Sequence, residues 1–329
     1  MKQTMVVLAF VNLILISNLC GADYVITKIS QGTTGNHHVH INNNSEAVWS
    51  GSDGTYQQVY YWNGTTITKI DVNSDNGYFT YPTISDDGDI AWDSRHGSIY
   101  EIEYYNASTH VVQTLVSSNI NKSNPCLDLN DNVAWYGYNN NDFQLNYRTS
   151  DGTISQLANG QHPETNNQGD LVWWGSSSGI YYRDVTTGLI TTISSSGQFP
   201  DINNNNEIAW TDNGDILVYD KTTGFTVNIT EAELSYENNR YPNLNNNGDI
   251  VWIGESSLYF YEKATGLIEK IADNISWYSQ PQINDSGDIA WRGTDDEIYI
   301  ASRSNTVPEP ITMILILISI CGMLIKRRK

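Results

Sequence analysis

Cysteine is scarce in this chain, and the positions of its three copies exclude a framework of disulfide bonds. Cys20 and Cys321 fall in apolar segments at the two ends, which leaves Cys126 without an intramolecular partner in the rest of the chain. Small secreted domains that cannot build a sufficient core depend on several disulfides. At 329 residues the chain is long enough to bury a sizeable core, so packing has to stabilise it.

Catalytic signatures are absent as well. The sequence contains no G-x-S-x-G, no H-E-x-x-H, no Walker sequence and no C-x-x-C. Positive charge is in short supply, since 17 Lys and Arg face 37 Asp and Glu, for a formal net charge of −20. Such a surface repels nucleic acid and anionic lipid. We therefore expect no nucleic-acid partner, and a function that depends on what the scaffold presents.

A twelve-residue pattern occurs seven times, and every copy ends in Trp. The copies are residues 38–49, 81–92, 124–135, 162–173, 199–210, 241–252 and 280–291. Successive terminal Trp residues are 37 to 43 residues apart. Repeats of this period that are rich in short strands are typical of a β-propeller with one blade per copy.

Each copy predicts a β-hairpin. The second position is Pro in six copies and Val39 in the first, which suits a strand with a free edge because Pro cannot donate to a strand ladder. The eighth position is mostly Gly, Asn or Asp, the residues that tolerate the positive φ of a tight turn. The seven Trp rings are expected in the core, whereas Trp62, Trp174 and Trp277 are outside the column and freer to be exposed.

Two further strands are predicted after each hairpin, so that each blade has four. Third strands are expected at 59–61, 180–182, 216–219, 258–261 and 297–301, and fourth strands at 67–70, 154–157, 189–193, 225–229 and 267–271. The last copy lacks its fourth strand, but residues 26–29 repeat the Ile-Thr-Lys-Ile of residues 67–70. We therefore predict one all-β domain over residues 23–305, a seven-bladed β-propeller whose last blade is closed by the N-terminal strand.

The N-terminal end predicts export. Residues 1–22 have one early Lys, a long apolar run and a Cys-Gly-Ala end, which together indicate a signal peptide cleaved after Ala22.

The C-terminal end, residues 306–329, places Pro308, Glu309 and Pro310 before an apolar run and four basic residues. This layout resembles the PEP-CTERM sorting signal of Gram-negative bacteria. The resemblance implies an exosortase-type processing enzyme as a partner, a transient inner-membrane anchor, and delivery to the cell surface or extracellular matrix, often beside exopolysaccharide production. The alternative is a plain membrane anchor, a short C-terminal transmembrane helix with its basic tail inside.

The repeats themselves resemble bacterial extracellular propeller repeats of the WD-repeat-like and TolB-like sort in period and strand layout. They lack the WD dipeptide. The resemblance therefore implies the fold and no particular ligand.

The first and third positions of the pattern are the candidate ligand-binding columns, because propellers usually bind ligands at the mouth of the central channel. These columns vary among the copies and combine aromatic rings with amides and carboxylates, which suits the stacking and hydroxyl recognition of sugars. The candidates are His38, Tyr81, His162, Glu164, Phe199, Asp201 and Tyr241. The alternative is that first-position side chains pack between blades and third-position side chains face channel water.

Metal binding is weakly indicated. The ninth position is acidic in six copies, which suits Ca²⁺, but the carboxylates are equally able to accept hydrogen bonds within the turns. His38 and His40 share one strand face, and two imidazoles do not complete a tetrahedral site. We assign no metal ligand and no cofactor and leave Ca²⁺ open.

The leading hypothesis is a non-catalytic protein of the cell surface or matrix that binds exopolysaccharide or another matrix component. One alternative is a glycan-active hydrolase or lyase that uses the carboxylates of Glu164 and Asp201. Another is a purely structural matrix component.

Overall fold

The computed structural model describes residues 24–75, 80–139, 142–230 and 238–304. All regular structure in these ranges is β-strand, which confirms the all-β class. The predicted signal peptide and the sorting segment with Pro308, Glu309 and Pro310 lie outside the described residues. Among the residues that the structure describes, no helix has the length and apolar character that crossing a membrane requires.

The chain divides into two compact units. One unit comprises residues 26–302 and holds all seven copies of the pattern. The other comprises residues 1–25 and 303–329, of which only 24–25 and 303–304 are described. In it, Arg303 Nε donates a hydrogen bond to the Tyr24 hydroxyl over 3.3 Å.

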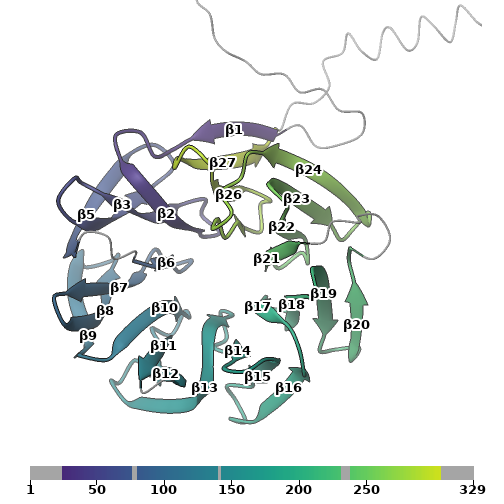
Figure 1. Cartoon of the computed structure of the whole chain (residues 1–329), viewed down its shortest axis with the longest axis horizontal. Coiled ribbons are helices and arrows are strands. Elements are labelled where there is room, and N and C mark those ends of the chain that lie inside the picture. The colour runs from purple at the N-terminus through teal and green to yellow at the C-terminus, as the bar shows by residue number, and fades with distance from the viewer. Residues whose placement is uncertain (1–23, 76–79, 140–141, 231–237, 305–329) are drawn as a thin grey trace, which may run out of the picture. The chain divides into compact units, whose positions relative to one another are not determined.

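Four-stranded antiparallel sheets, each made of consecutive strands, account for most of the larger unit (Figure 1). The first contains β2 (Thr34–Ile41), β3 (Ala47–Ser52), β4 (Gln57–Trp62) and β5 (Ile67–Ser74). The next contains β6 (Thr83–Ile84), β7 (Ile90–His96), β8 (Ile99–Asn106) and β9 (Val111–Ser118). Two more contain β17 (Gln198–Ile202), β18 (Glu207–Asp212), β19 (Asp215–Asp220) and β20 (Phe225–Asn228), and β21 (Asn239–Leu244), β22 (Ile250–Gly254), β23 (Ser257–Glu262) and β24 (Leu267–Asp273).

A seven-stranded sheet covers two copies of the pattern, because its middle strand serves both. Its strands are β10 (Asn121–Leu127), β11 (Val133–Asn139), β12 (Asp142–Arg148), β13 (Ile154–Thr165), β14 (Leu171–Gly175), β15 (Ile180–Arg183) and β16 (Ile190–Ser194). The first part of β13 pairs with β12 and its last part with β14. We predicted the fourth strand of one copy and the first strand of the next as separate segments; here they form one continuous strand.

The remaining sheet has the strand order β1-β27-β26-β25, so its sequence order is not consecutive. It combines β1 (Tyr24–Lys28) with β25 (Gln282–Ile283), β26 (Ile289–Arg292) and β27 (Ile298–Arg303). Just after β1, Ile29 N–H donates to the Ile298 carbonyl over 2.9 Å. The segment that repeats residues 67–70 therefore lies beside the last described strand of the chain.

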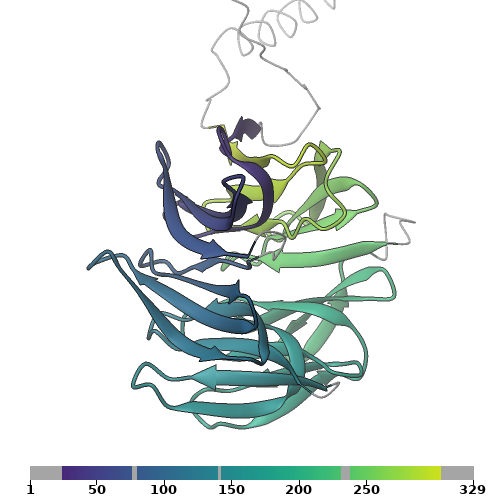
Figure 2. The same ribbon diagram turned by 60° about the vertical axis from the view of Figure 1, so that its left-hand side comes forward.

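The core lies between neighbouring sheets, where the Trp residues of the pattern are buried. All seven are at most 3% exposed, which confirms their predicted role. Each cluster joins residues of two copies of the pattern, as when Ile84, Ile90 and Trp92 pack on Val48 and Val59. Figure 2 shows the sheets of residues 26–302 as separate twisted layers that follow one another in chain order.

Every hairpin of the pattern pairs as predicted, but its first strand is interrupted. In five copies the register shifts at the first and second positions, as between Gln161 and Glu164. The first-position residue then has a positive φ near 50°, at His38, Asn124, His162, Phe199 and Tyr241. A bulge of this kind turns a side chain away from the direction that simple strand alternation would give it. The side chains at the first position are re-aimed accordingly.

Candidate functional site

The third position of every copy lines one central cavity. Its volume is about 130 Å³, and β2, β6, β10, β17 and β21, which carry five of these positions, lie nearest the middle in Figure 1. The seven third-position residues are His40, Thr83, Cys126, Glu164, Asp201, Asn243 and Gln282. Two candidate residues of the sequence analysis, Glu164 and Asp201, are therefore brought together here from successive copies.

Glu164 and Asp201 are two carboxyl groups in a setting that disfavours their charge. Burial raises the pKa of Glu164 well above its ordinary value, and the neighbouring charge of Asp201 raises that pKa further. Burial also raises the pKa of Asp201, to about 7, although the N–H groups of Leu244 and Ile202 act in the opposite direction. At neutral pH the pair therefore holds protons that ordinary carboxylates would have released.

The partners of these two groups differ. Asp201 accepts hydrogen bonds from the Asn243 side-chain amide and from Leu244 N–H, both over 2.8 Å, and is 9% exposed. Among the described residues, no hydrogen bond is formed by the Glu164 carboxyl, which faces the central cavity and is only partly buried. Glu164 is thus the carboxyl that remains available to a ligand.

A second, smaller pocket of about 30 Å³ adjoins the central cavity on the side of the first positions. Glu164, Asp201, Asn243 and Gln282 line both spaces and so lie between them. The remaining lining includes His162, Phe199, Tyr241, Gln280 and the prolines that follow the last three. We refer to this space as the aromatic side pocket.

First-position rings contact the ring of the next copy rather than standing free. His38 stacks on Tyr81 with ring centroids 3.7 Å apart, Phe199 meets Tyr241 at 4.4 Å, and His162 meets Phe199 edge-on at 5.3 Å. Burial lowers the pKa of His162 to about 4 and that of His38 well below its ordinary value, so both rings are neutral at pH 7. The candidates therefore form a row of neutral rings along one side of the cavity.

Exposed aromatic side chains continue this row outward. Trp277 is 49% and Tyr278 is 69% exposed, in the segment that leads to Gln280. The Arg240 guanidinium lies against the Trp277 ring and 5.6 Å from the centroid of Tyr241. The sequence analysis noted the freedom of Trp277 but missed Tyr278 and Arg240, because neither falls in the twelve-residue pattern.

On its other side the cavity is bordered by the sixth positions, which the sequence analysis did not consider. Six of them form a circuit of hydrogen bonds between successive copies that returns to its start and bypasses Leu129. The members in order are Asn43, Asp86, Asn167, Asn204, Asn246 and Asp285. The Asn and Asp side chains at this border therefore form hydrogen bonds mainly within the circuit.

Fifth-position asparagines link the copies in a second way. The side-chain amides of Asn42, Asn166, Asn203, Asn245 and Asn284 each donate to the fifth-position carbonyl of the next copy. Because these amides are buried, each contact satisfies a polar group that would otherwise be costly to bury.

The ninth-position acids, considered above as Ca²⁺ ligands, have donors within the protein. Asp249 accepts Lys263 N–H over 3.0 Å, Asp170 accepts Val185 N–H over 2.8 Å, and Glu46 accepts the Tyr61 hydroxyl. They stand on separate sheets and do not converge on one point. Their contacts are those of turn and strand acceptors.

His37, His38 and His40 do not converge on a common ligand either. His38 is engaged with Tyr81, whereas His40 lines the central cavity, where burial lowers its pKa to about 4 and the charge of Asp86 opposes that effect.

Neither a protein family nor a curated protein matches the sequence. Solved structures of propeller-like proteins do resemble the chain, which shows the fold alone at these identities. Virginiamycin B lyase from Staphylococcus aureus has a TM-score of 0.64 at 13% identity, over 86% of this chain and 99% of that one. Oligogalacturonate lyase from Vibrio parahaemolyticus has a TM-score of 0.61 at 10% identity, over 87% and 99%. TolB from Acinetobacter baumannii, at 13% identity over 86% and 80%, has a lower TM-score of 0.48.

Proposed function

We propose that this chain is an exported seven-bladed β-propeller that binds a neutral, hydroxyl-rich group, such as a sugar unit of an exopolysaccharide, in its central cavity. The observation that carries the proposal is the lining of that cavity. Amides, carboxyl groups, a threonine and a neutral histidine surround it, no Lys or Arg is among them, and a row of aromatic rings adjoins it.

The charge of the lining decides which ligands fit. An anionic ligand would meet Asp86, Asp285, Glu164 and Asp201 without a basic side chain to offset them. Burying an unpaired charge is costly, so phosphate, sulfate and uronate groups are disfavoured. Sugar hydroxyls both donate and accept hydrogen bonds, which matches Asn243, Gln282 and a protonated Glu164.

The aromatic side pocket supports the same ligand class. Ring faces that lie beside polar side chains bind the apolar faces of sugars, as Phe199 and Tyr241 are placed to do. Trp277 and Tyr278 extend this surface away from the cavity, so a polymer threaded along it would contact several rings. The sugar unit in the cavity would then supply only part of the total contact between the polymer and the protein.

Seven blades and a ring closed by β1 belong to this proposal. Support comes from the circuit of sixth-position hydrogen bonds, which passes from Asp285 back to Asn43, and from the Asn284 amide, which donates to the Asn42 carbonyl over 3.1 Å. The cluster of Ile29, Trp49 and Ile298 joins the last sheet to the first. A closed ring leaves no sheet edge exposed to pair with another molecule.

Export and surface delivery are part of the proposal through the sequence of the two ends. Residues 1–22 act as the signal peptide, and Pro308, Glu309 and Pro310 with the apolar run and basic tail act as the sorting signal read by an exosortase-type enzyme. A formal net charge of −20 suits a protein that works among neutral glycans or cations.

A hydrolase or lyase is the second candidate, and one observation favours it. The two carboxyl groups of Glu164 and Asp201 have raised pKa values and lie next to a cavity. A raised pKa keeps a carboxyl group protonated, as the general acid of a glycan-cleaving enzyme requires. Two of the similar solved structures are lyases by name. Cleavage by this chain would require Glu164 as the proton donor, since its carboxyl is the one not committed to protein donors.

Co-sedimentation of the purified full chain with the producer's extracellular polysaccharide tests the proposal. The Phe199→Ala/Tyr241→Ala double variant should lose at least tenfold in affinity. Phe225→Ala is the matched control, because Phe225 is 73% exposed on β20 of the same sheet as Phe199 and should bind normally. Equal binding by the double variant and the control would contradict a site at the cavity.

A reducing-end assay on the same mixtures separates the two candidate functions. The binding proposal predicts no new reducing ends. Polymer cleavage that disappears in Glu164→Gln would establish the enzyme instead. A circular dichroism melt of each variant identifies any loss of binding that comes from unfolding. If the double variant is unfolded, Trp277→Ala replaces it, because Trp277 is exposed.

A further inference from the structure

The second copy is one of three that lack a Trp–Tyr pair shared by the other four copies, and it alone has a carboxylate opposite the Trp. In four copies the twelfth-position Trp stacks on a Tyr of the next strand, with centroids 5.7 to 5.9 Å apart: Trp49–Tyr60, Trp173–Tyr181, Trp252–Tyr259 and Trp291–Tyr299. In each of these four copies a Gly lies two residues after the Trp: Gly51, Gly175, Gly254 and Gly293. A Cβ there would come within 2.6 to 3.0 Å of the Tyr ring, so Gly and Tyr belong together.

Both members of this pair are replaced in the second copy. Glu103 stands opposite Trp92 where the Tyr would be, and Ser94 stands where the Gly would be, opposite Glu101. Alternate residues of a strand point to the same face, so Trp92, Ser94 and His96 of β7 share a face with Glu101 and Glu103 of β8. The exchange removes a ring and introduces two carboxylates and a hydroxyl, with an imidazole at the end of the strand.

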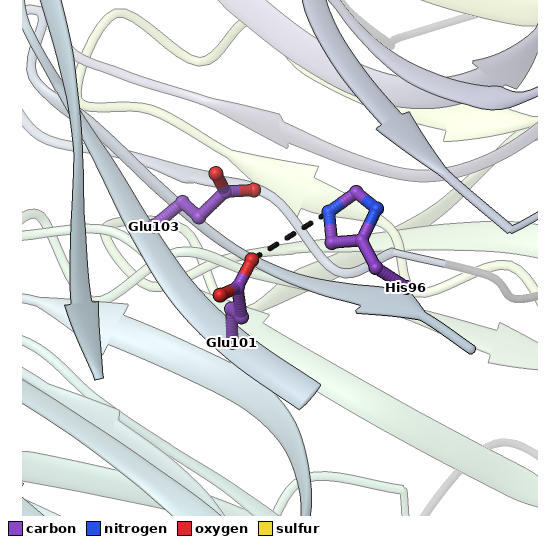
Figure 3. A group of neighbouring side chains, drawn as sticks. All are labelled: His96, Glu101 and Glu103. Atoms are coloured by element: carbon purple, nitrogen blue, oxygen red, sulfur yellow. Dashed lines mark ion pairs between the residues drawn. The ribbon is translucent and has the colours of Figure 1, made fainter. Parts of the chain in front are cut away.

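His96, Glu101 and Glu103 converge on one point of this face. Their ligand atoms all lie within 4.8 Å of one another, and His96 Nε2 is 3.6 Å from Glu101 Oε2 (Figure 3). Neighbouring donors hold the carboxylates in place: Ser117 Oγ donates to Glu101 Oε1 over 2.8 Å, and the Trp92 indole N–H donates to Glu103 Oε2 over 2.9 Å. Such supporting bonds are typical of metal ligands.

Ser94 adds a further donor on this face. Its side chain is fully buried and lies between Trp92 and His96 on the same strand face. Burial raises the pKa of Glu103, and hydrogen bonds from the Ser94 hydroxyl and the Trp92 indole oppose that effect. Both donors favour the ionised carboxylate, which is the form that binds a metal ion.

We propose that His96, Glu101 and Glu103 bind a divalent transition-metal ion, with Zn²⁺ as the representative. Two carboxylates and one imidazole are a ligand set that Zn²⁺ accepts, and the dication offsets two negative charges placed side by side. Ca²⁺ prefers oxygen ligands only, so the imidazole selects against it. Three protein ligands leave a coordination position open, and His96 is exposed, so water or a further ligand reaches the ion.

Isothermal titration of ZnCl₂ into the chelator-treated, tag-free full chain tests this proposal. We expect one equivalent to bind, with the dissociation constant raised at least tenfold in His96→Ala and in Glu103→Gln. The Gln retains an acceptor for the Trp92 indole, and Glu101→Gln is the substitute if Glu103→Gln fails to fold. His110→Asn, on the neighbouring turn with a φ of 58°, is the matched control and should bind as the unaltered chain does.

Two results would overturn the assignment. One is the absence of stoichiometric Zn²⁺ binding by the unaltered chain. The other is binding that survives unchanged in both His96→Ala and Glu103→Gln, which would place the ion elsewhere. A parallel titration with CaCl₂ should show no binding that depends on His96; Ca²⁺ affinity equal to that of Zn²⁺ and lost in His96→Ala would contradict the metal class.

Discussion

Substitution of one fifth-position asparagine should destabilise the packing of neighbouring sheets. The Asn203 side chain is 4% exposed and makes four hydrogen bonds, to the Asn245 carbonyl, the Glu207 carboxylate, and the N–H groups of Asn205 and Glu207. Ala at this position would remove all four, leave the buried Glu207 N–H without a partner, and break the link to the neighbouring sheet.

The magnitude follows from those groups. A buried polar group left without a partner costs about 1–3 kcal/mol, which applies to the Glu207 N–H. Each of the other three lost bonds contributes about 1 kcal/mol, because the Asn245 carbonyl, for example, still accepts the Gly248 N–H. We therefore expect Asn203→Ala to reduce the free energy of unfolding by about 3–5 kcal/mol. Asn205→Ala is the matched control, because its exposed amide makes one bond, to the Asn246 carbonyl over 2.7 Å, worth about 1 kcal/mol.

Urea unfolding of the full chain, followed by tryptophan fluorescence and circular dichroism together, measures both variants. Coincident transitions are needed before a free energy is assigned. If Asn203→Ala and Asn205→Ala shift the midpoint equally, or if Asn203→Ala costs less than about 1 kcal/mol, the buried amide does not couple the sheets and the reasoning fails.

Three further outcomes are expected from the same unfolding measurement. The pKa values of Glu164 and Asp201 in the folded state are raised above the ordinary value near 4, so the folded state binds more protons than the unfolded state. The free energy of unfolding should therefore fall as the pH rises from 4 through 7. Glu164→Gln should be more stable than the unaltered chain at pH 8, by on the order of a few kcal/mol, and equal to it at pH 4. Equality at both pH values would contradict the buried charge. Gly254→Ala should lose about 1–3 kcal/mol, because the new Cβ would lie 2.7 Å from Asn239 Oδ1 and 2.9 Å from the Tyr259 ring, and an unchanged midpoint would refute the tight contact. Removal of Ca²⁺ with EGTA should leave the midpoint unchanged, because the ninth-position carboxylates already accept protein hydrogen bonds; a lower midpoint would revive the Ca²⁺ hypothesis.

The architecture was largely predictable because the same residue types recur at equivalent positions of the seven copies. The Trp column marks one buried ring per copy, and the Pro column marks the strand that borders the cavity, so both report on packing wherever they occur. The continuity of β13 was not predictable, because a strand that ends one copy and begins the next has the same alternation as two separate strands.

The site was predictable in its columns but not in its contacts. The third positions surround one cavity, as their periodicity indicates, but the engagement of Phe199 with Tyr241 depends on the positive φ of both residues, which a residue before Pro seldom adopts. Asn204 is a residue type common in turns, so the sequence does not reveal that its side chain bonds to the neighbouring copy rather than within its own turn. The convergence of His96 with Glu103 depends on strand pairing and carries no signal in spacing.

The proposed function depends most on the neutrality of the ligand, and an affinity comparison tests this directly. Binding of the full chain to a neutral oligosaccharide from the producer's polymer would be measured by calorimetry beside an oligogalacturonate of equal length, with Gln282→Ala as the cavity variant. We expect the neutral sugar to bind, Gln282→Ala to weaken its binding, and the acidic sugar not to compete with it. Tighter binding of the acidic sugar, or neutral binding indifferent to Gln282→Ala, would contradict the proposed function.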